Sequence, residues 1–234
     1  MRIGIFSDIH GNLPALQAAW PVLRAEAETF IQLGDLAGYY PFVSEVLALL
    51  AESPVIHLLG NHDAVLVKAI DGGGIPPTYT PKYGRGLERG LERLSKADKA
   101  LLRALAPEAR IALGGHTFHA AHGAPWDPLN GRVYPDFQQW ELFTNAPEPA
   151  LFLLGHTHYQ ADLTHGARRI INPGSIGQPR KQGGVAQFAV LDTDGMKLQF
   201  FAVPYDVTPL VEDARRHNPD LPYLCEVLQR KARA

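Results

Sequence analysis

The chain contains 234 residues, of which 46% are apolar and 20% are charged, an ordinary composition for a globular protein with a large core. The formal net charge of −2 argues against extended binding along a nucleic-acid backbone, although it does not exclude a nucleotide or a strand end as substrate. Cys225 is the only cysteine, so no internal disulfide can form. There is no apolar run near the roughly 18 residues of a membrane span and no leader-like start. We expect a cytoplasmic protein without membrane contact that folds as one domain over residues 1–234.

The first third of the chain alternates between predicted strands and predicted helices. Short apolar runs predict strands at residues 3–6, 30–33 and 55–59. Apolar residues at helical spacing follow the first two strands, and Asn12 can cap the first of these helices. This order indicates βαβ units, whose parallel strands bring their carboxyl ends to one edge of a sheet. The runs expected at that edge are Asp8-Ile9-His10, Gly34-Asp35 and Gly60-Asn61-His62-Asp63.

The rest of the chain predicts a loop, several helices and more strands. Residues 71–86 are rich in Gly and Pro and carry Tyr79 and Tyr83, which predicts a loop that could cover the site as a flap. Helices are expected at 84–94, 96–106, 136–143 and, in one or two pieces, 207–232, and strands at 111–113, 117–121, 151–154, 161–164, 168–171, 185–191 and 197–203. Two of these strands end in further polar runs, His122-Gly123 and Gly155-His156-Thr157-His158.

Each polar run alone has an ordinary structural explanation, such as a helix cap, a common turn or a solvated pair of histidines. Five such runs at the ends of five apolar strands are much harder to explain separately. Together they offer imidazole nitrogens, carboxylate oxygens and an amide oxygen, a mixture that suits two divalent metal ions. The pattern therefore predicts a metal site at the sheet edge.

The runs DxH, GD, GNHD, HG and GHTH, in this order over residues 8–158, resemble those of the calcineurin-like metallophosphoesterase superfamily. Residues 172–180 (NPGSIGQPR) and 203–207 (VPYDV) resemble a branch of small stand-alone bacterial and archaeal phosphoesterases. The resemblance implies an α/β fold, a four-layer αββα sandwich of two mixed β-sheets flanked by helices. It also implies hydrolysis of small phosphodiesters or phosphomonoesters, including nucleotide-like ones. The alternative is a non-catalytic metal-binding scaffold on the same fold.

The resemblance also assigns roles to the residues of these runs. The first metal would be held by Asp8, His10 and His158, the second by Asn61, His122 and His156, and Asp35 would bridge the two. Such ligands suit Mn, Fe, Co, Ni or Zn better than Mg²⁺ or Ca²⁺ alone. A metal-bridging hydroxide would attack phosphorus, His62 would assist the phosphate or leaving group, and Asp63 would orient the His62 imidazole.

Other residues are candidates for substrate contacts or for structural roles. Arg180 and Trp126 are candidate substrate contacts, for which a solvated loop and ordinary packing are the alternatives. Gly115-His116-Thr117-Phe118 imitates the GHTH run but lacks its second histidine, and structural or solvated roles are expected for His57, His116, His119, His165 and His217. Residues 36–41 (LAGYYP) lack the Asp-Arg-Gly run of the protein Ser/Thr phosphatases and diadenosine tetraphosphate hydrolases, which argues against both activities. An apolar helix face near the C-terminus, if exposed, would be compatible with a homodimer.

Overall fold

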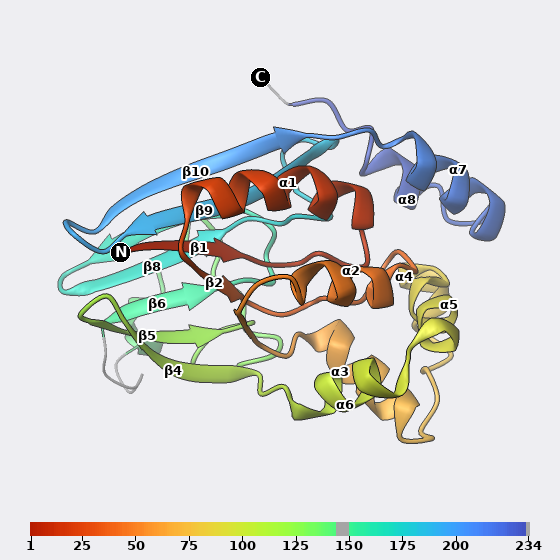
Figure 1. Ribbon diagram of the computed structural model, residues 1–234, viewed down its shortest axis with the longest axis horizontal. Helices are drawn as coiled ribbons and strands as arrows, with labels where there is room; N and C mark the ends of the chain where they lie inside the picture. Colours follow the sequence, from red (N-terminus) through yellow and green to blue (C-terminus); the bar gives the residue numbers. More distant parts are fainter. Residues whose placement is uncertain (144–149, 233–234) are drawn as a thin grey trace.

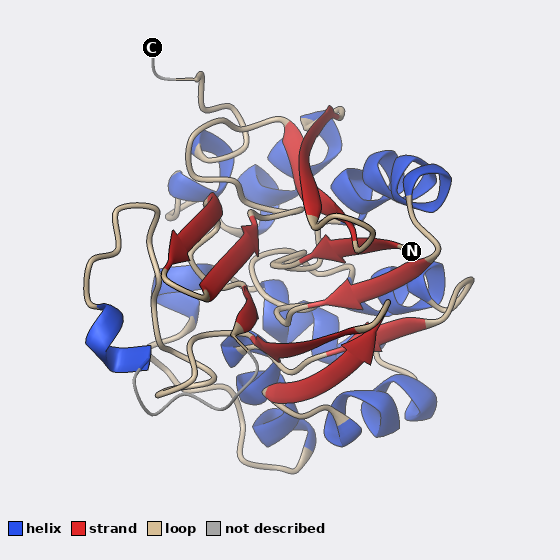
Figure 2. Cartoon of the chain, turned by 90° about the vertical axis from the view of Figure 1, so that its left-hand side faces the viewer, coloured by secondary structure: helices blue, strands red, loops and turns tan. Residues whose placement is uncertain are grey.

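The computed structural model describes residues 1–143 and 150–232. Within them, two five-stranded β-sheets stack face to face and helices lie outside the sheets (Figure 1). This arrangement confirms the predicted αββα sandwich of two mixed sheets. Over the second sheet, the described residues form a thin outer layer of one 3₁₀ helix and a long loop (Figure 2).

The first sheet contains the three parallel strands predicted at the start of the chain. Its order in space is β10–β9–β1–β2–β3, with β1, β2 and β3 parallel, β9 antiparallel to β1, and β10 antiparallel to β9. The strands are β1 (Arg2–Phe6), β2 (Thr29–Gln32), β3 (Val55–His57), β9 (Val185–Asp192) and β10 (Lys197–Pro204). The parallel part brings the ends of β1 and β2 side by side, as the βαβ pattern predicted.

The second sheet has the order β4–β5–β6–β8–β7. The inner pairs β5–β6 and β6–β8 are parallel, and the edge pairs β4–β5 and β7–β8 are antiparallel hairpins. The strands are β4 (Glu108–Leu113), β5 (His116–Ala121), β6 (Leu151–Leu154), β7 (Gln160–His165) and β8 (Arg168–Pro173). The parallel centre places the ends of β5 and β6, and hence the HG and GHTH runs, next to each other.

Side-chain alternation along β1 separates two cores. Ile3 and Ile5 point toward the second sheet, where they join a buried cluster that includes Phe118 and Leu153. Phe6 belongs instead to the cluster between the first sheet and the outer helices. Alternation with a period of two residues is what places consecutive strand residues on opposite faces of a sheet.

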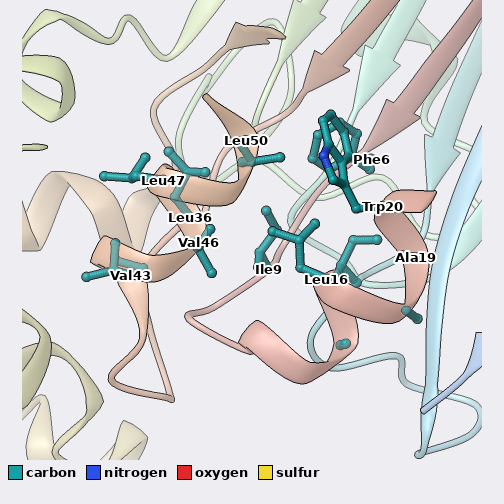
Figure 3. Close-up of a cluster of buried hydrophobic side chains, with 14 of the residues drawn as sticks. Phe6, Ile9, Leu16, Ala19, Trp20, Leu36, Val43, Val46, Leu47 and Leu50 are labelled. Atoms are coloured by element: carbon teal, nitrogen blue, oxygen red, sulfur yellow. The ribbon is translucent and has the colours of Figure 1, made fainter. Parts of the chain in front are cut away.

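The outer helices pack closely on the first sheet. Figure 3 shows Trp20 of α1 beside Phe6, and Leu16 of α1 and Val46 of α2 near Ile9 in the same buried cluster. A Cβ on Gly4 would lie 2.9 Å from Leu23 Cδ2, so the glycine allows α1 to approach β1. The helices are α1 (Leu13–Glu26), α2 (Val43–Leu50), α3 (Asn61–Ile70), α4 (Thr80–Tyr83), α5 (Gly86–Arg93), α6 (Lys96–Ala104), η1 (Trp140–Phe143), α7 (Thr208–His217) and α8 (Tyr223–Glu226).

Three expectations differ from the structure. The helix predicted at 136–143 is only the 3₁₀ helix η1, and the loop predicted at 71–86 contains the short helix α4. The apolar side chains of α7 and α8 are buried against Tyr39 and Tyr40, because these helices cover the loop after β2. The expected exposed apolar face is therefore not present on these helices, and the homodimer itself stays a prediction. None of the helices within the described residues combines the length and the apolar character required to cross a membrane.

Candidate metal centre

Five of the predicted ligands have a backbone conformation that is unfavourable for a residue with a side chain. Positive φ occurs at six non-glycine residues of the described chain, and only Met196 among them is not a predicted ligand. The other five are Asp8, His10, Asp35, His156 and His158. All five lie in turns after β1, β2 or β6. Left-handed backbone costs about 1–2 kcal/mol per residue, and strain of this kind clusters at functional sites.

The first group of ligands brings together Asp8, His10 and His158. The Nε2 atoms of the two histidines are 3.0 Å apart, and His158 Nε2 is 3.2 Å from Asp8 Oδ1. Both Nδ1 atoms face backbone carbonyl oxygens, of Ala37 at 3.3 Å and Gln178 at 2.8 Å. A carbonyl oxygen only accepts hydrogen bonds, so each Nδ1 carries the ring proton and each Nε2 presents a lone pair.

The Nε2 lone pairs of His10 and His158 and the Oδ1 atom of Asp8 thus lie together with no hydrogen-bond donor between them. Asp8 Oδ1 is buried and has no hydrogen-bond partner among the described residues. Burial holds the pKa of His10 well below its ordinary value, so protonation of this ring does not resolve the conflict. A cation at this point would satisfy all three acceptors, and the donor set therefore fits the divalent metal predicted from the sequence.

The second group brings together Asp35, His122 and His156. His122 Nδ1 donates to the backbone oxygen of Leu33 at 2.7 Å, which leaves Nε2 facing Asn61 Oδ1 at 3.0 Å and Asp35 Oδ2 at 3.4 Å. Burial alone would lower the pKa of His122, but the carboxylates of Asp35 and Asp8 raise it to about 9. Without a metal, a proton on His122 Nε2 can lie between the imidazole and the oxygens of Asn61 and Asp35. A metal ion fits the same position.

Asp35 lies between the two groups. Its Oδ2 atom is 3.4 Å from His122 Nε2 and 3.8 Å from His10 Nε2, so one carboxylate faces a histidine of each group. Its Oδ1 atom accepts the backbone N–H of His62 at 2.9 Å. Burial would raise the pKa of Asp35, but His122, His62 and His10 hold it well below its ordinary value. The carboxylate is therefore ionised and positioned between both clusters.

His62 and Asp63, predicted to work together, have different partners. His62 Nδ1 is hydrogen-bonded to the hydroxyl of Tyr79. The Asp63 carboxylate instead accepts backbone N–H groups of Leu36, Ala37 and Gly60, at 3.2, 2.8 and 3.0 Å. Burial and the nearby Asp35 raise the pKa of Asp63 to about 7, although these three donors lower it. The expectation that Asp63 orients His62 is corrected: Asp63 holds the backbone around Asp35.

The NPGS run, noted in the sequence only as a branch resemblance, supports both ligand loops. Asn172 Nδ2 donates to the Gly155 carbonyl at 2.8 Å and to Thr157 Oγ1 at 3.1 Å. Ser175 Oγ donates to the carbonyl of Asp8 at 2.8 Å. These buried hydrogen bonds connect the end of β8 to the turns after β6 and β1, and thereby fix the ligand positions from outside.

An open cavity of about 730 Å³ lies over the two groups. Its wall is cationic and rich in tyrosine: it includes Lys82, Arg132, Arg180, Tyr39, Tyr83, Tyr134, Tyr159 and Tyr223. Arg180 donates to the Tyr223 hydroxyl, and Arg132 Nε donates to His156 Nε2 at 3.3 Å. Within the described residues, neither arginine forms an ion pair with a carboxylate. The cavity is therefore suited to an anionic ligand.

Not every predicted site residue reaches this cavity. Arg180 lines it, whereas Trp126 stacks on Phe137 and lies edge-on to Phe143 in the aromatic cluster outside the second sheet. Trp126 thus contributes to packing rather than to the cavity wall. The five histidines expected to be structural or solvated also lie outside the cavity wall; these are His57, His116, His119, His165 and His217.

Sequence reasoning missed several residues of the cavity. Lys82 lies in the short helix α4, Arg132 in a loop and Tyr223 in α8, and no strand-end pattern marks any of them. Tyr79 and Tyr83 lie in the predicted flap, and the sequence alone assigns them no role. The available signal was the presence of two tyrosines in a segment otherwise rich in Gly and Pro.

Comparisons with known proteins indicate the family of this chain. Residues 1–196 match the family model of the calcineurin-like phosphoesterase superfamily domain. An uncharacterized protein of Methanocaldococcus jannaschii is 26% identical to this chain, in an alignment that covers 90% of each protein.

Two crystal structures match over almost the full length of both chains. A hypothetical protein from Pyrococcus horikoshii OT3 has a TM-score of 0.81 and 25% identity, covering 100% of this chain and 99% of that one. A metallophosphoesterase from Sphaerobacter thermophilus has a TM-score of 0.76 and 26% identity, with 97% and 98% covered. These matches confirm the resemblance seen in the sequence. The chain belongs to the calcineurin-like phosphoesterase superfamily.

Proposed function

We propose that this protein is a dinuclear metal-dependent phosphoesterase that hydrolyses small phosphodiesters or phosphomonoesters, nucleotide-like esters included. The main support is the arrangement of acceptors around Asp35. Lone pairs of His10 and His158 face each other at 3.0 Å, His122 faces two oxygens, and Asp35 lies between these histidines. Two adjacent cations would satisfy all of these groups.

In this proposal Asp8, His10 and His158 hold one ion, and Asn61, His122 and His156 hold the other, with Asp35 shared. Bound divalent ions supply a Lewis acid for the phosphate and activate water for attack on phosphorus. The ligand set does not distinguish Mn, Fe, Co, Ni and Zn, all of which accept mixed nitrogen and oxygen ligands.

His62 is the proposed proton or hydrogen-bond donor to the phosphate or the leaving oxygen. Its imidazole lines the cavity next to both ligand groups, and Nδ1 is already bonded to Tyr79, which leaves Nε2 available for substrate. A histidine that can donate within hydrogen-bond reach of the reacting group is the usual arrangement for acid assistance.

The cavity wall supports a small anionic substrate with an aromatic or nucleotide-like part. Lys82, Arg132 and Arg180 can attract the phosphate and any second anionic group. The tyrosine side chains can pack against a ring. A cavity of about 730 Å³ lies within the range of small-molecule sites.

The test is turnover of p-nitrophenyl phosphate and bis-p-nitrophenyl phosphate by metal-stripped protein, with Mn²⁺, Ni²⁺, Co²⁺, Zn²⁺ and Mg²⁺ added back separately. We expect turnover only with added metal, and the preferred ester distinguishes monoesterase from diesterase. In His62→Ala we expect metal content to stay unchanged and kcat to fall about 10²–10⁴-fold, the usual contribution of a positioned acid or base. Two bound ions without turnover of either ester would instead favour the non-catalytic metal-binding protein.

A further inference from the structure

Tyr79 is a buried residue at the end of an exposed loop. Residues 71–74 and 76–78 are exposed, whereas the Tyr79 side chain is 6% exposed and belongs to the main core cluster. The loop thus turns one aromatic side chain inward at the start of α4. Burial of a tyrosine in a loop requires a partner for its hydroxyl, because an unpaired buried donor is costly.

That partner is His62. The Tyr79 hydroxyl is hydrogen-bonded to His62 Nδ1, and it has no other side-chain or backbone partner within the described residues. The rings of Tyr79 and Tyr83 both lie edge-on to the His62 ring, with centroids 5.5 Å and 4.7 Å away. The Tyr39 ring also packs on His62, with its centroid 5.3 Å away. Of these three tyrosines, only Tyr79 contacts His62 through a hydrogen bond.

The direction of this hydrogen bond follows from comparing which atom of the Tyr79 hydroxyl would stay unpaired in each case. If Nδ1 donated to the phenol oxygen, the buried Tyr79 hydroxyl proton would have no acceptor. If the hydroxyl donates to Nδ1, only an oxygen lone pair is left unpaired, which is tolerated more often than an unpaired donor. The ring proton of neutral His62 then lies on Nε2, the nitrogen that can reach substrate.

We propose that Tyr79 is a positioning residue for His62: its hydroxyl fixes the tautomer and the ring rotation that direct Nε2–H into the cavity. The inference rests on the proposed function for the role given to His62. Asp63 cannot orient His62, because its carboxylate accepts the backbone N–H groups of Leu36, Ala37 and Gly60. In this proposal Tyr79 takes that orienting role.

A double-mutant cycle tests the coupling of the two residues. In the wild-type background we expect Tyr79→Phe to lower kcat about tenfold, with KM within about twofold, which is the effect of losing roughly one hydrogen bond. In the His62→Ala background the same substitution should lower kcat less than about twofold, because nothing is left to position. Equal effects in both backgrounds, or no effect in wild type, would overturn the proposal.

A second measurement does not depend on activity. Long-range ¹⁵N–¹H spectra of the histidine rings in metal-free protein report the tautomer, and His62→Ala identifies the His62 signals. We expect wild type to carry the proton on Nε2 and Tyr79→Phe to shift both ring nitrogens of His62. Tyr83→Phe is the matched control for this spectrum, because its ring packs on His62 without the polar contact.

These two measurements separate the proposal from the function on which it rests. If wild type turned over no ester with any metal, the proposed function would fail, while the spectra would still decide whether Tyr79 sets the tautomer. Unchanged His62 signals in Tyr79→Phe, an Nδ1-protonated ring in wild type, or an equal shift in Tyr83→Phe would each contradict the inference.

Discussion

Gly60→Ala tests the position of Asp35 without substituting any proposed ligand. Gly60 has φ −92° and ψ 173°, an extended conformation that alanine adopts without strain. A Cβ at this position would nevertheless lie 2.1 Å from Asp35 Oδ1 and 2.2 Å from Asp35 N. The substitution therefore acts mainly through a steric clash with the carboxylate proposed to be shared by both ions.

The size of the effect follows from this overlap. Relaxing the contact from 2.1 Å to an ordinary separation of roughly 3.5 Å requires Asp35 or the Gly60 backbone to move by about 1.4 Å. Overpacking of this kind costs about 1–3 kcal/mol of folding stability. Displacing a ligand that its surroundings hold in place typically weakens metal affinity by about 10–100-fold. We expect a loss of that order for Mn²⁺, with a parallel loss of turnover.

The assay is calorimetric titration of Mn²⁺ into metal-stripped wild type and Gly60→Ala, followed by turnover at saturating metal. Affinity is the informative readout, since alanine is also a poorer helix cap than glycine and lowers stability by a separate route. Gly73→Ala is the matched control: it changes a loop glycine whose added Cβ would lie 3.1 Å from Lys68 O, away from the site. Wild-type affinity in Gly60→Ala would refute the placement of Asp35.

Three further predictions concern other parts of the structure. Asn172→Ala removes buried hydrogen bonds to the GHTH turn and should lower the free energy of unfolding by about 1–3 kcal/mol, measured by urea denaturation; an unchanged midpoint would contradict this role. Burial lowers the pKa of His57 from 6.5 to about 4, so protonation of His57 favours the unfolded state. In metal-stripped protein, the free energy of unfolding should therefore fall as the pH is lowered from 6.5 to 4. Over that window His57→Leu should lose about 2–3 kcal/mol less unfolding free energy than wild type. Arg180→Met should raise KM for the anionic esters severalfold with little change in kcat, and steady-state kinetics with an unchanged KM would exclude Arg180 from substrate binding.

The pattern of polar runs at strand ends was sufficient to find the residues that come together at the candidate metal centre. A parallel sheet brings the carboxyl ends of its strands together whatever the intervening sequence, so Asp8, Asp35 and Asn61 could be placed at one edge from apolar runs alone. The layered fold followed from the family resemblance, because strand rhythm does not determine how two sheets stack. The thin outer layer of the second sheet had no corresponding sequence signal.

Side-chain partners were less predictable than backbone positions. Asp63 follows His62 directly in the chain, but both lie in α3, where neighbouring residues do not face each other. The Asp63 carboxylate turns back to the first turn of the helix, and Tyr79 approaches His62 from a loop whose path no periodicity encodes. Trp126 follows His122 by four residues, yet the intervening turn directs it into an aromatic cluster.

The most direct test of the central claim is anomalous diffraction from crystals of this protein grown with Mn²⁺. The account predicts two anomalous peaks separated by roughly 3.5–4 Å. One peak should be in contact with Asp8, His10 and His158, the other with Asn61, His122 and His156, and Asp35 should touch both. A single peak, or peaks away from Asp35, would contradict a dinuclear centre at this site.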